Sequence, residues 1–173
     1  MRRDPARSQA ALEAIEELAR RTVDEIDQIV GTLRERGPGI GAVDAPPGLA
    51  SLDTLVERHA ASGLAVSVSS EGTPRRLESA VDQAAYRILQ EALTNAARHG
   101  TGEARVKLAF GEAALELSVS NAASGDDAPR ANGGHGLIGM RERATLLGGS
   151  LDVERVNGSF RVRARLPYRG AST

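Results

Sequence analysis

The chain has 173 residues, of which 40% are hydrophobic, and a formal net charge of −1 at pH 7. This length suits one ordinary domain with an appendage, and the hydrophobic content is sufficient for a core. A near-neutral chain with only 2% aromatic residues offers neither a basic field for phosphates nor platforms for stacking bases, so we expect no nucleic-acid partner. Cysteine is absent, which excludes disulfides and thiolate chemistry.

No apolar run approaches the roughly 20 residues that a transmembrane helix needs. We therefore expect a cytoplasmic fragment without membrane contact, whether or not the full-length protein is anchored in a membrane.

The first predicted element is an amphipathic helix over residues 8–36. Its apolar residues recur in steps of three and four, which is typical of a heptad seam. The seam can fold back on its own domain or pair with a second copy, and its length favours a homodimer. Residues 37–48 hold four glycines and three prolines, which predicts a linker. A second domain is then expected over residues 49–168.

Helical and strand periodicities alternate through this second domain. Helices are predicted over about 52–62, 78–98 and 137–147, and strands over 65–70, 105–110, 115–119, 151–155 and 160–166. The strands present one apolar and one polar face, so helices are needed on one side only. The pattern predicts an α/β fold, a two-layer sandwich in which three helices cover one face of a mixed sheet of about five strands.

Three polar residues of the 78–98 segment and its end, Glu91, Asn95 and His99, stand four residues apart. On a helix this spacing places them on one face beside the apolar stripe. A carboxylate, an amide oxygen and an imidazole in a row can activate a nucleophile, hold Mg²⁺ and contact phosphate. By itself, such a trio more often forms an ordinary solvated face.

A second pattern is the glycine-rich run 133–136, which opens directly into the helix predicted from Leu137. Glycines allow a close approach of the backbone to an anion, and a helix start directs free N–H groups at it. A triphosphate fits such a turn, although glycines before a helix are more often a flexible connection.

In residue identities as well as in spacing, residues 86–96 resemble the N box of a known ATPase family, and residues 133–143 resemble its G2 box. This family unites sensor histidine kinases, Hsp90-type chaperones, type II topoisomerases and MutL-type repair ATPases. Both segments look specifically like histidine kinases that pair with LuxR-type response regulators. The resemblance implies ATP and Mg²⁺, with Glu91 as the base or polarising group and Asn95 as the metal ligand. It further implies nucleotide contacts by Asn95, Arg98, His99, Asn121, Gly125, Gly134, His135, Gly136, Leu137, Gly139, Met140 and Ser159.

One segment departs from the family pattern. Asn121 and Ala123 stand where the adenine pocket normally shows an aspartate and a glycine, and only Gly125 fits the frame. An amide can still read adenine, but with a neutral hydrogen bond in place of a charge-assisted one, which predicts modest affinity. Two assignments stay open: His135 can equally be a solvated histidine, and Ser159 can belong to a plain hairpin turn.

The N-terminal helix resembles the later helix of a dimerisation hairpin, and a phosphoacceptor segment is not seen before it. His59, His99 and His135 all lie in the predicted catalytic domain, so the acceptor is expected on a dimerisation region outside this chain. The leading hypothesis is therefore an ATP-dependent histidine kinase domain. The alternatives are a degenerate nucleotide-binding regulatory module, which the altered Asn121 segment favours, and an anti-sigma-factor serine kinase on the same fold, which the heptad helix disfavours.

Overall fold

The computed structural model describes residues 47–123, 135–156 and 158–168. The predicted dimerisation helix over 8–36 lies outside the described residues, as does the linker apart from its last two positions. The segment that holds Gly125 and Gly134 lies outside them as well.

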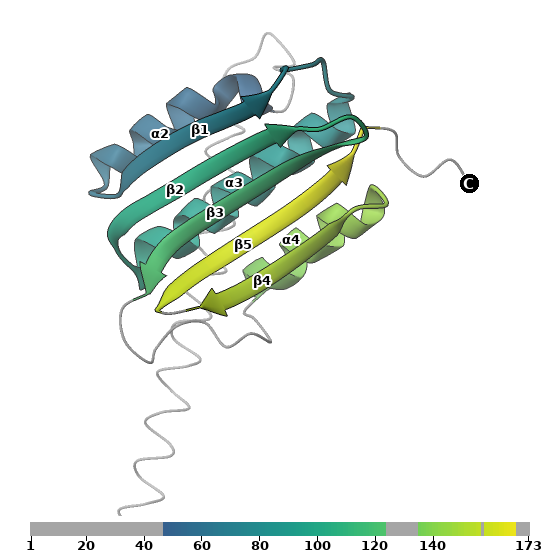
Figure 1. Ribbon diagram of the computed structural model, residues 1–173. Helices are drawn as coiled ribbons and strands as arrows, with labels where there is room; N and C mark the ends of the chain where they lie inside the picture. The colour runs from purple at the N-terminus through teal and green to yellow at the C-terminus, as the bar shows by residue number, and fades with distance from the viewer. Residues whose placement is uncertain (1–46, 124–134, 157, 169–173) are drawn as a thin grey trace, which may run out of the picture. The chain divides into compact units, whose positions relative to one another are not determined.

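Five strands form one mixed sheet with the order β1-β2-β3-β5-β4 (Figure 1). The strands are β1 (Ala65–Gly72), β2 (Gly100–Phe110), β3 (Ala114–Ala123), β4 (Ser150–Val156) and β5 (Ser159–Pro167). β1 and β2 run parallel, since a helix connects them, and the remaining pairs are antiparallel. The predicted mixed sheet of about five strands is confirmed.

Three helices, α2 (Leu52–Ala61), α3 (Ser79–His99) and α4 (His135–Leu146), cover one face of this sheet (Figure 1). A 3-10 turn, Leu49–Ser51, precedes α2. The prediction of three helices on one face is confirmed, with one shift that matters for the site. Because α4 begins at His135 and not at Leu137, Gly136 lies within its first turn. None of the described helices is long and apolar enough to cross a membrane.

The core lies between the sheet and the helices and follows the two periodicities of the sequence. On β5, alternate residues from Phe160 to Leu166 are buried, and the arginines between them are exposed. On α3 the buried residues follow the helical period: Val81, Ala85, Tyr86, Ile88, Leu89, Ala92, Leu93 and Ala96. Burying each large apolar side chain contributes about 1.5–3 kcal/mol, so this face fixes α3 against the sheet.

The strand β1 differs from the expected alternation. Val66 is only half-buried and Val68 is 44% exposed. The reason is position, because β1 forms one edge of the sheet and has a strand on one side only. An edge strand is less completely covered than a central strand of the same sequence pattern.

The chain enters this domain through a contact with the first turn of α3. The Leu49 amide donates a hydrogen bond to Asp82 Oδ1 at 2.9 Å. Gly48, the last residue of the predicted linker, lies so close to the Asp82 carboxylate that a Cβ at that position would overlap with it. Gly48 is therefore packed against the domain rather than part of a free connection.

Candidate nucleotide-binding site

The second half of α3 carries the polar row predicted from the sequence. Glu91 and Asn95 are half-buried, one turn apart, whereas His99 and the neighbouring Arg98 are exposed at the end of the helix. The apolar stripe of α3 faces the sheet, so the half-buried positions lie at the border between the core and solvent. A polar group at such a border is held in place by its surroundings and can still reach a ligand.

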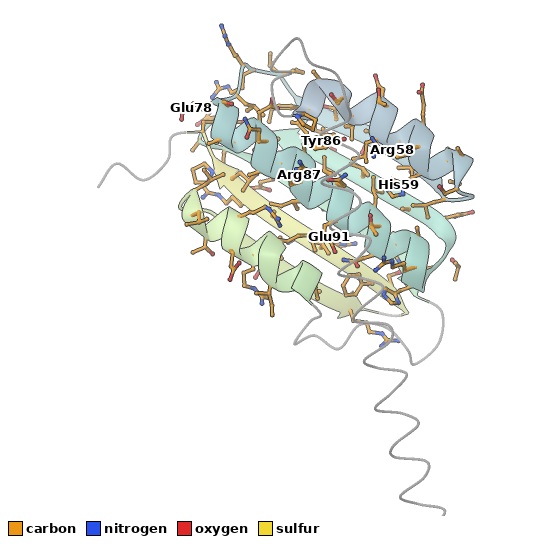
Figure 2. The ribbon with its side chains drawn as sticks, turned by 180° about the vertical axis from the view of Figure 1, so that it is seen from behind. Arg58, His59, Glu78, Tyr86, Arg87 and Glu91 are labelled. Atoms are coloured by element: carbon orange, nitrogen blue, oxygen red, sulfur yellow. The ribbon has the colours of Figure 1, made fainter. Side chains whose placement is uncertain are left out.

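The row extends backwards to Arg87, which the sequence interpretation did not include. Arg87 is half-buried one turn before Glu91, and its guanidinium donates a hydrogen bond to Gln90 Oε1 at 2.9 Å. Figure 2 shows Arg87 and Glu91 along α3, on the side of the molecule that carries the helices. The same four-residue spacing that singled out Glu91 and Asn95 was the signal that would have found Arg87.

Glu91 meets the start of α4. Its carboxylate lies directly against Gly136, where a Cβ would overlap with Oε1 and stand 2.9 Å from Cδ. This contact joins the two segments that the sequence singled out independently, the polar row of α3 and the glycine run before α4. A glycine is required at this point for the close approach of backbone and carboxylate.

Two of the predicted nucleotide contacts on α4, Leu137 and Met140, have side chains buried in the hydrophobic core. These side chains anchor α4 against the sheet and α3, so a nucleotide contact by either residue is restricted to its backbone. Gly139 lies on the same helix and faces the Arg143 side chain. A Cβ at position 139 would stand 3.1 Å from Arg143 Nη1. For His135 only the backbone, at the first position of α4, is described.

Asn121 lies on β3 at the end of α3, in the adenine-reading position of the family pattern. It is 7% exposed and is the one buried polar residue found in the described part of the chain. Its Nδ2 donates a hydrogen bond to the Ala122 carbonyl at 3.1 Å. Gly100 makes room for this side chain, since a Cβ there would stand 2.9 Å from Asn121 Nδ2. Gly100 directly follows α3, and no pattern in the sequence indicated this packing role.

Ser159 begins β5 and pairs in register with Ala122, which places it beside the residue that follows Asn121. Its side chain is exposed. The structure therefore brings Asn121, Ser159 and the end of α3 to one end of the sheet, and Glu91 to the start of α4.

The donor set fits a magnesium ion that is held mainly by a nucleotide. Within residues 47–123, 135–156 and 158–168 no group of three or more His, Asp or Glu side chains is arranged to hold a metal. Mg²⁺ commonly binds proteins through one or two oxygen ligands together with substrate phosphates and waters. The half-buried Asn95 has an amide oxygen of this kind, and no hydrogen bond commits the amide to another of the described residues.

Residues 80–170 match the family described as histidine kinase-, DNA gyrase B- and HSP90-like ATPases. The chain belongs to this family. Among curated proteins, this chain is 30% identical over 156 residues to the sensor histidine kinase LnrJ of Bacillus subtilis, covering 88% of this chain and 36% of that protein. It is 25% identical over 160 residues to the sensor histidine kinase DesK of the same organism, covering 91% of this chain and 40% of DesK. The chain thus spans two-fifths or less of the length of these relatives.

Solved structures show the same fold. The histidine kinase domain of the blue-light activated kinase EL346 from Erythrobacter litoralis aligns with a TM-score of 0.55 at 20% identity, over 74% of this chain and 70% of that domain. The Acinetobacter baumannii histidine kinase AdeS aligns with a TM-score of 0.55 at 14% identity, over 97% and 87% of the two chains. The described domain is therefore a member of the histidine kinase-, DNA gyrase B- and HSP90-like ATPase family, and the two curated relatives above are sensor histidine kinases.

Proposed function

We propose that this domain transfers the γ-phosphate of ATP to a histidine on a dimerisation region, from which the phosphate passes to a LuxR-type response regulator. The observation that carries the proposal is the contact between Glu91 and Gly136. It places a carboxylate at the start of the helix where the glycine-rich segment would receive the phosphates. Phosphoryl transfer needs mainly positioning and charge neutralisation, and both are available at such a junction.

Each part of the site has a role in this proposal. Asn121 binds the adenine, and the backbone at the start of α4, from His135 to Gly136, faces the phosphates. Asn95 holds Mg²⁺, which neutralises phosphate charge when it is bound. Glu91 polarises the acceptor imidazole, so that its nitrogen attacks the γ-phosphorus and ADP leaves. The remaining predicted contacts with the nucleotide are made by Arg98, His99, Gly125, Gly134, Leu137, Gly139, Met140 and Ser159.

The proposed partners follow from the family. The acceptor region and the response regulator are separate from the described domain, and the helix that the sequence predicts over residues 8–36 would pair with that of a second copy. Relatives that are named sensor histidine kinases favour this reading over a serine kinase of the anti-sigma type.

Radiolabelled ATP tests the proposal. The full chain is incubated with Mg·ATP and a dimerisation fragment of LnrJ or DesK that carries its acceptor histidine. We expect acid-labile label on the fragment and none on this chain. Glu91→Gln should retain ATP binding and lower transfer by about 100-fold, the usual scale of a lost general base. Glu116→Gln, an equal change on the far side of the sheet, is the matched control. Label on this chain alone, or equal transfer by both variants, would contradict the assignment.

A regulatory nucleotide-binding module is the second candidate, because the Asn121 amide already donates to the Ala122 carbonyl. One of its donors is therefore occupied within the protein. Such a module would bind ATP, or fail to bind it, without transferring phosphate to any supplied acceptor fragment. The transfer assay separates the two candidates, and calorimetric titration of ATP shows whether a domain without transfer activity still binds the nucleotide.

A further inference from the structure

Within the described residues, no helix lies on the face of the sheet that points away from α2, α3 and α4 (Figure 1), and the strand residues on this face are mostly polar. On the central strands, alternate side chains point to this face while their neighbours enter the core. Its charged residues from β2, β3 and β5 are Glu103, Arg105, Lys107, Glu116, Arg161, Arg163 and Arg165. The proposed kinase site uses none of them.

Strand register sorts the middle of this face into two parallel rows. In one row Arg105 of β2 pairs with Ser120 of β3, which pairs with Arg161 of β5. In the next row Lys107, Ser118 and Arg163 repeat the arrangement. We call the four cations the basic quartet: Arg105, Lys107, Arg161 and Arg163. Since neighbouring strands lie about 4.8 Å apart, the two cations of each row have backbones about 10 Å apart, with a half-buried serine between them.

The quartet is largely uncommitted within the protein. Lys107 Nζ contacts Glu71 Oε1 at 2.7 Å, with both side chains about half exposed at 49% and 62%. Such an exposed pair contributes little and exchanges readily. For Arg105, Arg161 and Arg163, no ion pair is found with any described residue, although Glu154 and Asp152 of β4 stand opposite Arg161 and Arg163 in register.

Carboxylates surround the quartet. Asp152 and Glu154 lie on its β4 side. Glu71 and Glu116 belong to the next row, beyond Lys107 and Arg163, and Glu103 lies on the opposite side, beyond Arg105 on β2. We call these five acids the acidic border. Their negative charges equal in number the positive charges of the quartet and Arg165, so the face has no net positive field at long range. An extended polyanion such as nucleic acid, or a negatively charged membrane, would meet this acidic border as well as the quartet. A compact acidic group would meet only the quartet.

We propose that the basic quartet is a docking surface for a short acidic segment of a partner protein. Guanidinium groups bind carboxylates in a bidentate manner, and the hydroxyls of Ser118 and Ser120 add donors between them. A partner surface complementary to this face has acidic residues at its centre and basic residues around them. The acidic border would attract those basic residues and repel other acidic ones, so it contributes specificity. Since the exposed contacts are polar, binding is weak and sensitive to salt.

The test is a titration of the isotopically labelled full chain with an acetylated, amidated pentaglutamate peptide, followed by NMR at low salt. Amide signals of residues 105–107, 118–120 and 161–163 should shift, and the shifts should disappear in high salt. Arg161→Gln combined with Arg163→Gln should weaken binding, by roughly fivefold for each exposed pair lost. Arg58→Gln combined with Arg76→Gln removes the same charge from exposed positions on α2 and the loop before α3, and should bind as wild type does.

A second variant tests the border acids. A gain of binding confined to the signals of these strands distinguishes a local effect from the general attraction that a change in net charge produces. Asp152→Asn combined with Glu154→Gln removes the border acids that stand opposite Arg163 and Arg161 in register, and should strengthen peptide binding several-fold at the same signals. Equal affinity of wild type and the Arg161/Arg163 variant would overturn the proposal. It is also overturned if a 20-nucleotide oligo-dT or phosphatidylserine vesicles bind these signals more tightly than the peptide, since the surface would then serve a polyanion or a membrane. The substituted arginines and Asp152 are exposed, and Glu154 is half-buried on an edge strand, so a change in the far-UV spectrum is not expected.

Discussion

The Glu91 carboxylate and the Gly136 backbone are in direct contact, although they belong to different helices. Glycine is the only residue that allows this approach, because any Cβ at position 136 would overlap with Oε1. The contact sets the position of the carboxylate relative to the start of α4, and with it the geometry that the proposed transfer needs.

Gly136→Ala should therefore lower phosphotransfer more than it lowers nucleotide affinity. A displacement of about 1 Å at a reacting group can cost about 100-fold in rate. Since a Cβ at position 136 would meet the end of the flexible Glu91 side chain, the carboxylate should shift while the free energy of unfolding changes little. Gly139→Ala adds a methyl group to the same helix but meets only the flexible Arg143 side chain, so it should not reduce the melting temperature. Transfer assays and thermal unfolding measure both effects. Transfer by Gly136→Ala at the wild-type rate would show that the contact does not position Glu91.

Asn95→Ala should remove the magnesium dependence of ATP binding. The lost ligand is an oxygen that faces a charged group, and such interactions contribute about 1.5–3 kcal/mol, or roughly tenfold to 100-fold in affinity. Titration calorimetry with Mg²⁺ or with EDTA gives the two affinities. Gln83→Ala removes an amide from the exposed start of the same helix and serves as control. If magnesium strengthens ATP binding to the same extent in wild type and Asn95→Ala, the metal is held elsewhere.

Asn121→Asp should strengthen ATP binding and weaken the fold. A carboxylate restores the charge-assisted bond of the family pattern, which exceeds a neutral hydrogen bond by about 0.5–2 kcal/mol. It also replaces the donor that now bonds to the Ala122 carbonyl, leaving two acceptors in contact at a buried position. We expect the free energy of unfolding to fall by about 1–3 kcal/mol. Urea unfolding and ATP titration are the measurements, and unchanged ATP affinity would argue against an adenine contact at this residue.

His59 should make the domain less stable as the pH falls. Burial first, and the neighbouring Arg58 second, lower the pKa of its imidazole below the ordinary value. The unfolded chain then binds more protons than the folded chain, so stability rises with pH between the lowered pKa and about 6.5 and is constant above that window. His59→Gln should flatten this part of the stability curve. Urea midpoints measured from pH 5 to 8 test the prediction, and an equal slope in wild type and variant would contradict it.

Tyr168→Phe should leave the domain as stable as wild type or more stable. The Tyr168 hydroxyl is buried and has no hydrogen-bond partner in the part of the chain that the structure describes, and such a group costs about 1–3 kcal/mol. The ring itself is used, since the Arg75 guanidinium lies 4.6 Å from its centroid, and phenylalanine keeps that contact. Tyr168→Ala, which removes the ring, should be clearly destabilising. A fall in melting temperature for the Phe variant would mean that the hydroxyl is satisfied in solution.

The sequence by itself determined the elements of this domain and the row on α3. Strand β5 alternates between core residues and arginines, and α3 repeats its apolar residues with the helical period. Both patterns are local, because backbone geometry alone decides which side chains share a face. The spacing of Glu91 and Asn95 predicted a common face for the same reason. The sequence of the segment that contains them was sufficient to indicate the family.

Tertiary structure decided which of these local features meet. The approach of Glu91 to Gly136, and of Asn121 to Gly100, joins segments far apart in the sequence, and no periodicity specifies such a pair. Packing against the core likewise buries Leu137 and Met140, and the edge position leaves β1 exposed in spite of its alternating sequence. Contacts of this kind depend on how helices and strands stack and on strand order, which are properties of the whole fold rather than of any single segment.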